Sequence, residues 1–427
     1  MQIVVKNSAG RIAALSVAIV VFVVLVTWVG RAYLAGVIGD RPAIANYQTA
    51  SHLDPGNSSY ALSLGRMYEY TVANADPARA LSDLTRAVQL NPYNAQAWLD
   101  LATAFEFQGN NAKAEACMRR ADALRPRAPN FQWAIGNFFL LRNNVNEAFR
   151  HFKAVLSADP GYETEIFNIA WKASGNAGTI LSEVVPDRPG PDLDYLNYLV
   201  AGHRMSDAAA VWNRIEANPE KFPPNYASYY IDVLIMSGQP EQAYKVWMTL
   251  RAKGLIPSTD EATSRNLVEN GDFENPLLGF GFGWRVAAVN GVYVGLDDNT
   301  YHSATKALMI VFPGNRNVDY HNIYQFVPVL PAHHYRLTAF MKADGVTTDS
   351  GPRLEVKDAF APARLDKYSD QLKGSTPSWM PLSIDFDTSP QTRLVVVGIS
   401  RPASQLFGGE IAGRVWVDDV TLTATAK

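Results

Sequence analysis

Side chains able to carry out chemistry are few in this sequence, and their spacing forms no catalytic pattern. The chain has 427 residues, with 7 histidines and 1 cysteine. It lacks Gly-x-Ser-x-Gly, His-Glu-x-x-His, a phosphate-binding glycine loop and a dinucleotide fingerprint. The pair His333-His334 has no carboxylates at metal-ligand spacing, and Cys117 has no cysteine with which to pair. We therefore predict a protein that is not an enzyme and requires no cofactor.

The charge balance excludes one class of partner. Lys and Arg number 38 against 41 Asp and Glu, a formal net charge of −3. Non-specific nucleic-acid binding rests on neutralising phosphates with many basic side chains, and no such excess is present. We expect no nucleic-acid partner.

An uncharged apolar run lies near the amino terminus. Residues 12–29 would form about 27 Å of helix at about 1.5 Å per residue, close to the thickness of a bilayer core. We predict a single transmembrane helix at 12–29, a cytoplasmic segment at 1–11, and the remainder outside the cytoplasm. The architecture leads us to expect a bacterial inner membrane protein whose bulk is periplasmic. A single cysteine is compatible with export, because it has no partner with which to mispair. The alternative is a cleaved signal peptide, whose apolar part is usually shorter, about 7 to 15 residues.

The next part of the chain repeats. Pro55, Pro92, Pro126 and Pro160 are 37, 34 and 34 residues apart, and small and large residues recur at helical spacing before each one. Leu64-Gly65 and Tyr68, with their counterparts in later units, complete a pattern that resembles the tetratricopeptide repeat. The resemblance implies an α-solenoid of about six helical hairpins over residues 40–256.

In such arrays the first helix of each hairpin lines a groove that binds protein. The resemblance carries this role to the matching positions here. The groove candidates are Arg66, Tyr70, Leu99, Thr103, Glu106, Phe107, Asn130, Trp133, Asn137 and Leu140.

From about residue 266 the hydrophobic period changes to 2, which is typical of strands. Val, Ile, Phe, Tyr and Thr gather in short segments separated by turn residues. These segments are 307–312, 323–329, 334–343, 353–358, 379–387, 393–400 and 414–424. We therefore predict an antiparallel β-sandwich at 266–427.

Three motifs in this domain carry a second resemblance. Asn270-Gly271-Asp272-Phe273-Glu274 opens the domain, Tyr335 to Phe340 lies in its middle, and Trp416 to Leu422 closes it. Together they resemble the galactose-binding-like jelly roll found in carbohydrate-binding modules. That resemblance implies a possible structural calcium ion, held by Glu274, Asp418 and Asp272.

Sugar binding requires exposed rings, which cover the apolar face of a pyranose, with polar groups beside them for its hydroxyls. Aromatic residues in irregular, polar stretches are better candidates than those inside strands. The glycan candidates are Tyr293, Tyr301, His302, Tyr320 and His321.

These parts predict a membrane-anchored scaffold outside the cytoplasm. Its solenoid would bind protein partners, and its sandwich would bind a glycan or another partner, in the assembly or export of a surface polysaccharide. Two alternatives stay open: a purely structural or protein-docking subunit of an envelope complex, and a glycan-modifying enzyme, since glycoside hydrolysis needs only two well-placed carboxylates.

Overall fold

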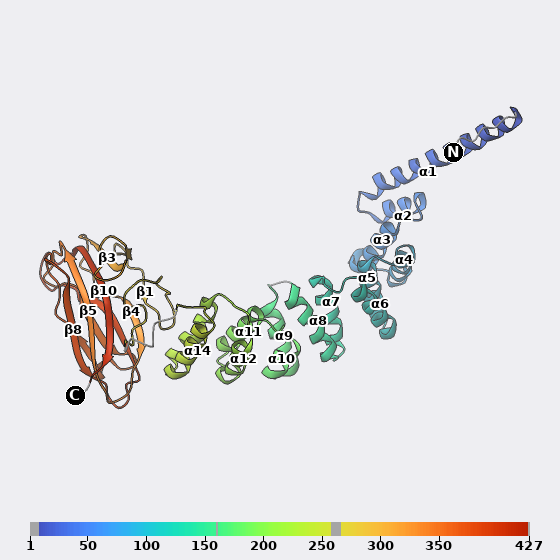
Figure 1. Cartoon of the computed structure of the whole chain (residues 1–427). Helices are drawn as coiled ribbons and strands as arrows, with labels where there is room; N and C mark the ends of the chain where they lie inside the picture. Colours follow the sequence, from blue (N-terminus) through green and yellow to red (C-terminus); the bar gives the residue numbers. More distant parts are fainter. Residues whose placement is uncertain (1–7, 159–160, 258–265, 426–427) are drawn as a thin grey trace. The chain divides into compact units, whose positions relative to one another are not determined.

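The computed structural model describes residues 8–158, 161–257 and 266–425, and it places helices before strands (Figure 1). The described residues form 14 α-helices and 10 β-strands. The predicted fold class, helices followed by an antiparallel sandwich, is confirmed. Two compact units divide the chain, residues 1–186 and 187–427. Residues 1–7 of the predicted cytoplasmic segment and the Asp159-Pro160 pair of the repeat pattern lie outside the described residues.

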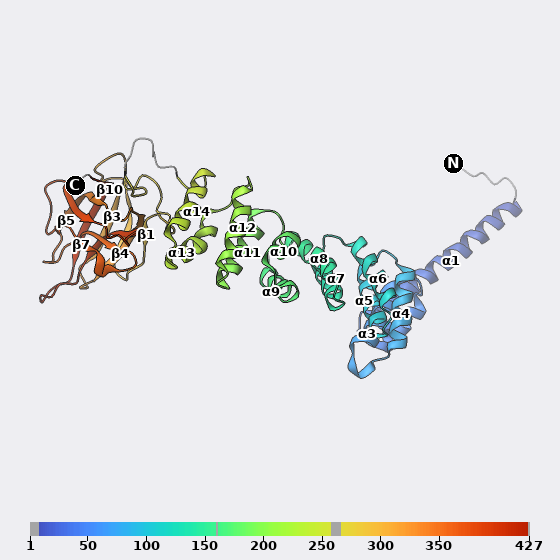
Figure 2. The ribbon, with the colours of Figure 1, turned by 90° about the horizontal axis from the view of Figure 1, so that it is seen from below.

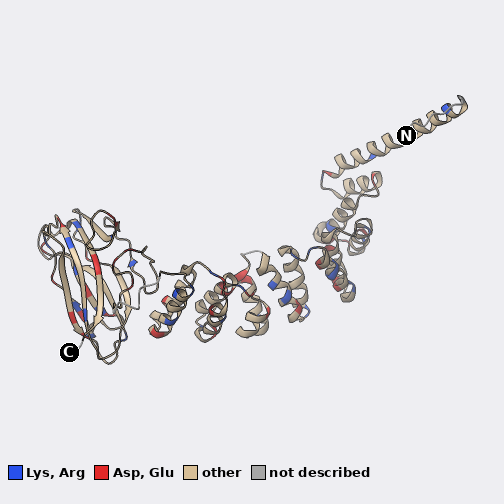
Figure 3. Ribbon diagram, in the orientation of Figure 1, with Lys and Arg blue, Asp and Glu red and all other residues tan. Residues whose placement is uncertain are grey.

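The apolar run forms a helix longer than predicted. Helix α1 (Ser8–Gly39) continues past residue 29, because its last turns pack on α2 (Ile44–Leu53) through Ala35 and Ala50, which are fully buried. Its mean hydropathy over the most apolar window is 2.9, and none of that window is buried. Figure 3 shows α1 almost free of charged residues along its length. By length and composition α1 is able to cross a membrane; a signal sequence meets the same test.

Paired helices follow in the first unit. They are α3 (Ser58–Tyr70), α4 (Pro77–Leu90), α5 (Ala95–Phe107), α6 (Asn111–Leu124), α7 (Pro129–Leu141), α8 (Val145–Ala158), α9 (Glu163–Ser174) and α10 (Ala177–Glu183). Side chains of Asp76, Asn94 and Asn110 cap three of these helices by accepting backbone N–H groups. A Cβ on Gly65 would lie 2.5 Å from Leu84 Cγ, so glycine permits the close approach of α3 and α4.

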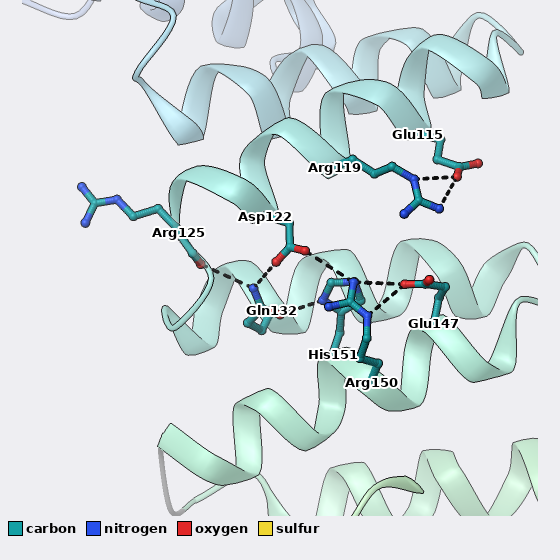
Figure 4. Close-up of polar contacts among 8 residues, drawn as sticks. All are labelled: Glu115, Arg119, Asp122, Arg125, Gln132, Glu147, Arg150 and His151. Atoms are coloured by element: carbon teal, nitrogen blue, oxygen red, sulfur yellow. Dashed lines mark hydrogen bonds and ion pairs between the residues drawn. The ribbon is translucent and has the colours of Figure 1, made fainter.

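A polar network with a buried centre at Gln132 and His151 joins α6, α7 and α8 (Figure 4). His151 is 1% exposed; its Nδ1 lies 2.6 Å from Gln132 Oε1 and its ring stacks on Phe139. Gln132 Nε2 donates to Asp122 Oδ1 at 2.7 Å, and Arg150 contacts Asp122 at 3.4 Å. The network fixes the relative placement of three helices by directional bonds as well as by packing.

The second unit begins where the repeat pattern is interrupted by prolines. Its helices are α11 (Pro189–Ala201), α12 (Met205–Ala217), α13 (Ser228–Met236) and α14 (Pro240–Ala252), so six hairpins, α3/α4 to α13/α14, are present in the described residues. The compact unit places α11 to α14 together with all ten strands. The domain borders predicted near residues 256 and 266 stay predictions.

The strands form two antiparallel five-stranded sheets. One sheet has the order β1 (Arg285–Val286), β4 (Tyr320–Pro328), β9 (Leu394–Arg401), β6 (Arg353–Asp358) and β7 (Asp366–Tyr368). The other has the order β2 (Tyr293–Asp297), β3 (Ala307–Pro313), β10 (Ala412–Ala424), β5 (His334–Asp344) and β8 (Met380–Asp387). Residues of both sheets share one core, which includes Leu308, Leu337, Val356 and Val397. All seven predicted strands are present, and β1, β2 and β7 are additional.

Helices α13 and α14 pack directly on the sandwich within the second unit, and Figure 2 shows them beside β1 and β4. Trp247 of α14 meets Phe280 and Phe282 at ring-centroid distances of 5.5 and 6.0 Å. Arg285 of β1 forms two hydrogen bonds with the carboxylate of Asp232 on α13, at 3.2 and 2.5 Å. The last hairpin and the sandwich are therefore joined by aromatic packing and by an ion pair.

Candidate binding surfaces of the solenoid and the sandwich

A polar cluster lies between α3 and α5, the first helices of two neighbouring hairpins. Asp100 is 3% exposed, contacts Arg66 Nε at 3.1 Å and accepts from Gln96 Nε2 at 2.9 Å. Burial raises the pKa of Asp100. Burial and the neighbouring Asp100 raise the pKa of Glu69 to about 7, against the opposing effect of Arg66. Arg66 therefore contacts the Asp100 carboxylate, and it acts on Glu69 only through its charge.

An exposed apolar side chain ends each of three successive first helices. Tyr70, Phe107 and Leu141 are the last residues of α3, α5 and α7, and they are 55%, 77% and 80% exposed. They are 37 and 34 residues apart, the intervals that separate the repeat prolines. Equivalent positions of a repeat present the same kind of side chain, so we name these three residues the apolar stripe. Large apolar side chains that are solvent-exposed at the same position of successive repeats favour contact with another protein.

One outward face of the sandwich combines aromatic and charged side chains. Strand pairing places Arg285, Tyr324, Gly398, Glu355 and Tyr368 at one register level across β1, β4, β9, β6 and β7. Residues paired in this way have side chains on the same face of a sheet. Inner-face residues alternate with them and are buried in the core, as Leu354 and Val356 are. We call the outward set His321, Tyr324, Arg353, Glu355, Lys357 and Tyr368 the β4–β6 face.

Charges on the β4–β6 face are paired around one carboxylate. Glu355 is 4% exposed; its Oε2 lies 2.8 Å from His321 Nδ1, and its Oε1 accepts from Lys357 Nζ at 3.0 Å. The guanidinium of Arg353 lies 5.9 Å from the centroid of the Tyr368 ring. Burial, together with the nearby Glu355 carboxylate, raises the pKa of Tyr368 to about 12, so its hydroxyl keeps its proton. The buried Glu355 carboxylate thus holds two partly exposed groups, His321 and Lys357, on the same face as the two rings.

Comparison with known proteins addresses the two parts separately. Residues 72–134 match the tetratricopeptide repeat model. No curated protein sequence matches the chain.

Solved structures similar to the chain fall into a helical group and a β-rich group. MamA is 17% identical, with a TM-score of 0.27, covering 40% of this chain and 83% of MamA. The CBM22-2 xylan-binding domain of Paenibacillus barcinonensis Xyn10C is 17% identical, with a TM-score of 0.26, covering 38% and 98%. The CBM22-1 and GH10 modules of Clostridium thermocellum xylanase 10B are 16% identical, with a TM-score of 0.27, covering 37% of this chain. The chain spans 28% of that xylanase structure.

Helices α3, α5 and α7 place the predicted groove residues in different environments. Arg66, Tyr70 and Thr103 belong to or adjoin the cluster around Asp100, and Phe107 belongs to the apolar stripe. Others are engaged in packing or in bonds within the solenoid: Leu99 is buried, Trp133 contacts Phe152 and Tyr162, Glu106 pairs with Arg142 at 3.0 Å, and Asn137 donates to Trp133 O. Asn130 is exposed and Leu140 half-buried. Their role in protein binding stays a prediction.

The predicted glycan residues do not form one surface. Tyr293 and Tyr301 are 60% and 43% exposed, but Tyr320 is 1% exposed in the core against Phe312 and is unable to stack on a sugar. Inner-face residues of β4 alternate with outer ones, which explains why Tyr320 is buried while His321 is on the β4–β6 face. His302 stacks on Phe340 with ring centroids 3.7 Å apart. The glycan candidates chosen from the sequence included none of Tyr324, Glu355 and Tyr368.

Two of the three predicted calcium ligands accept backbone hydrogen bonds in the described structure. Asp418 is fully buried, and its Oδ2 accepts from the backbone N–H groups of His302 and Ser303 at 2.8 and 3.0 Å. Glu274 Oε1 accepts from the N–H groups of Thr305 and Lys306, both at 2.8 Å. Asp272 is exposed. These N–H groups use part of the acceptor capacity of the Asp418 and Glu274 oxygens, and calcium binding by Glu274, Asp418 and Asp272 stays a prediction. Within the described ranges, no group of three or more His, Cys, Asp or Glu side chains is placed to hold a metal ion.

Proposed function

We propose that this protein is a membrane-anchored, non-catalytic binding protein that holds an oligosaccharide on the β4–β6 face. The supporting observation is the register level that carries Tyr324, Glu355 and Tyr368. Three strand spacings separate the two tyrosines, about 14 Å at about 4.8 Å per strand. That separation exceeds one pyranose ring, so the two rings suit different sugars of one chain, with the charged groups between them for hydroxyls.

The absence of a side chain at the centre of this row supports the same function. Gly398 lies between Tyr324 and Glu355, and a Cβ there would meet the carbonyl oxygen of Ile323 at 2.6 Å. Because position 398 is glycine, no side chain projects from β9 between Tyr324 on one side and Tyr368 on the other. A chain molecule laid across the strands would contact both rings without a clash at β9.

Binding of soluble polysaccharides to the full chain in detergent tests this proposal. We expect Tyr324→Ala and Tyr368→Ala each to weaken binding about tenfold, about 1.4 kcal/mol. Glu355→Gln removes the charge that positions His321 and Lys357, and should also weaken binding. Tyr293→Ala is the matched control, because Tyr293 is an exposed tyrosine on the other sheet.

The outcomes separate the alternatives. If Tyr293→Ala loses binding while the face variants retain it, the sugar surface is on the other sheet. If no neutral or acidic polysaccharide binds, the sandwich is a docking or structural module. Release of shortened products during the assay would identify a glycan-modifying enzyme.

For the solenoid we propose protein binding along the apolar stripe, in a periplasmic setting such as polysaccharide assembly or export. Support comes from the recurrence of exposed Tyr70, Phe107 and Leu141 at one repeat position. A photo-crosslinking residue at position 107 should capture a defined protein in membranes, and Leu141→Ser should reduce the yield. An equal yield from position 93, where exposed Tyr93 lies outside the stripe, would contradict specific binding.

A further inference from the structure

A cavity of about 630 Å³ lies where the packing of α1 against α2 ends. One side is a single face of α1, because Val24, Thr27, Trp28, Arg31 and Ala32 follow the spacing of helical neighbours. The other side is the turn from Leu53 to Asn57 between α2 and α3. The same face of α1 continues to Ala35, which packs on α2. The cavity therefore begins where helix packing ends.

The cavity is apolar at one end and charged at the other. Val24 and Trp28 belong to the apolar run at residues 12–29. At the other end, Arg31 carries a positive charge and Asp54 a negative one. Val24 and Arg31 are separated by about 10 Å along the helix. A bilayer changes from hydrocarbon to headgroups over a comparable distance, about 5 to 8 Å on each side. The lining thus follows the polarity of a membrane interface.

Arg31 is held in place by backbone acceptors. Its Nε donates to Leu53 O at 3.2 Å and its Nη2 donates to His52 O at 3.1 Å. A guanidinium has five N–H donors, and these two bonds leave others for a phosphate. Asp54 lines the same cavity, and its carboxylate makes no hydrogen bond or ion pair among the described residues. It is therefore able to accept hydrogen bonds from a primary ammonium group bound there.

We propose that this cavity binds a phospholipid whose headgroup carries a primary amine, of the phosphatidylethanolamine type. Arg31 holds the phosphate, Asp54 accepts from the ammonium group, and the acyl chains leave along Val24 and Trp28. A choline headgroup has no N–H to donate to Asp54, and a glycerol headgroup has no positive charge. This inference rests on the membrane anchoring proposed above, but not on glycan or protein binding.

Native mass spectrometry of the full chain in detergent tests the proposal. Phosphatidylethanolamine, phosphatidylcholine and phosphatidylglycerol with identical acyl chains are added in turn. We expect the ethanolamine lipid to be retained at least about fivefold more than the other two. Arg31→Gln should reduce retention of all lipids, whereas Asp54→Asn should remove the preference for ethanolamine. Arg41→Gln is the control, because Arg41 also follows the apolar run but does not line the cavity.

Each result bears on a different claim. Equal retention of the three lipids, or unchanged retention in both Arg31→Gln and Asp54→Asn, would overturn the cavity proposal. Circular dichroism shows whether a variant that loses lipid is still folded. Extraction of the chain from membranes by alkaline carbonate would instead defeat the anchored part of the proposed function.

Discussion

His151 is a buried base whose protonation is opposed by the fold. Burial and the neighbouring Arg150 lower the pKa of His151 to about 4, although Asp122 and Glu147 act in the other direction. An unfolded histidine takes up a proton near pH 6.5. Between these values the unfolded chain binds more protons, so the free energy of unfolding falls as the pH drops from about 6.5 to about 4.

The pH dependence gives a prediction. A pKa lowered from about 6.5 to about 4 corresponds to a loss of roughly 3 kcal/mol at the acid end. We expect His151→Gln to remove most of this acid dependence in urea unfolding followed from pH 7 to pH 4. His52→Gln, which changes an exposed histidine, should leave it intact. An acid slope that persists unchanged in His151→Gln would contradict this account of the network.

The period-2 pattern predicted the longer strands, but it did not predict that Tyr320 points inward or which outward side chains of different strands meet. Tyr324, Glu355 and Tyr368 come from β4, β6 and β7, and β9 lies between the first two in the sheet. Alternation within a strand is local information. The order of strands depends on how distant segments close a core, and a single sequence does not contain that order. The β4–β6 face therefore became visible only through the pairing.

At the scale of elements, the joint between α14 and the sandwich depends on a glycine. Gly281 has φ of +56°, and a Cβ there would lie 2.6 Å from Trp247 Cζ3. Alanine would incur about 1 kcal/mol for the left-handed backbone and roughly 1 to 3 kcal/mol for displacing the indole. We expect Gly281→Ala to destabilise the chain and to increase hydrogen exchange in α14.

A neighbouring glycine supplies the control for the joint. Gly279 has φ of +77°, and a Cβ there would have no atom within 4 Å, so Gly279→Ala carries the backbone cost alone. We expect hydrogen exchange of the backbone amides of α14 in Gly279→Ala to stay at the wild-type rate. Equal exchange in the two variants would show that contact with Trp247 does not hold α14 on the sandwich.

Elements with long, regular patterns were predictable, and short ones were not. The seven predicted strands have 6 to 13 residues, whereas β1 and β7 have 2 and 3 residues. Two or three residues do not establish a period, and such strands at sheet edges form because a neighbouring strand offers hydrogen bonds. The extended α1 was likewise missed because Ala35 and Gly39 are small residues that pack on α2 and Tyr60, outside the apolar run.

At the scale of the whole molecule, the proposed topology has a direct test. A reporter active only outside the cytoplasm, fused after Lys427, should be active, and the same reporter fused before Met1 should be inactive. The physical reason is that one apolar helix, α1, separates the two ends of the described chain. Activity at the amino terminus alone would reverse the orientation. Release of an active, shortened chain into the soluble fraction would indicate cleavage of a signal peptide.

The ion pair between Arg285 and Asp232 has a mechanical consequence. Arg285 stands at the edge of the same register level that carries Tyr324 and Glu355, and it is bonded to α13 through two hydrogen bonds. Tension on a polymer held across these strands would pass through β1 into the last helical hairpin as well as along the backbone. The pair therefore acts as a second attachment that shares the load, and the sandwich would resist being pulled away from the helices when its ligand is under strain.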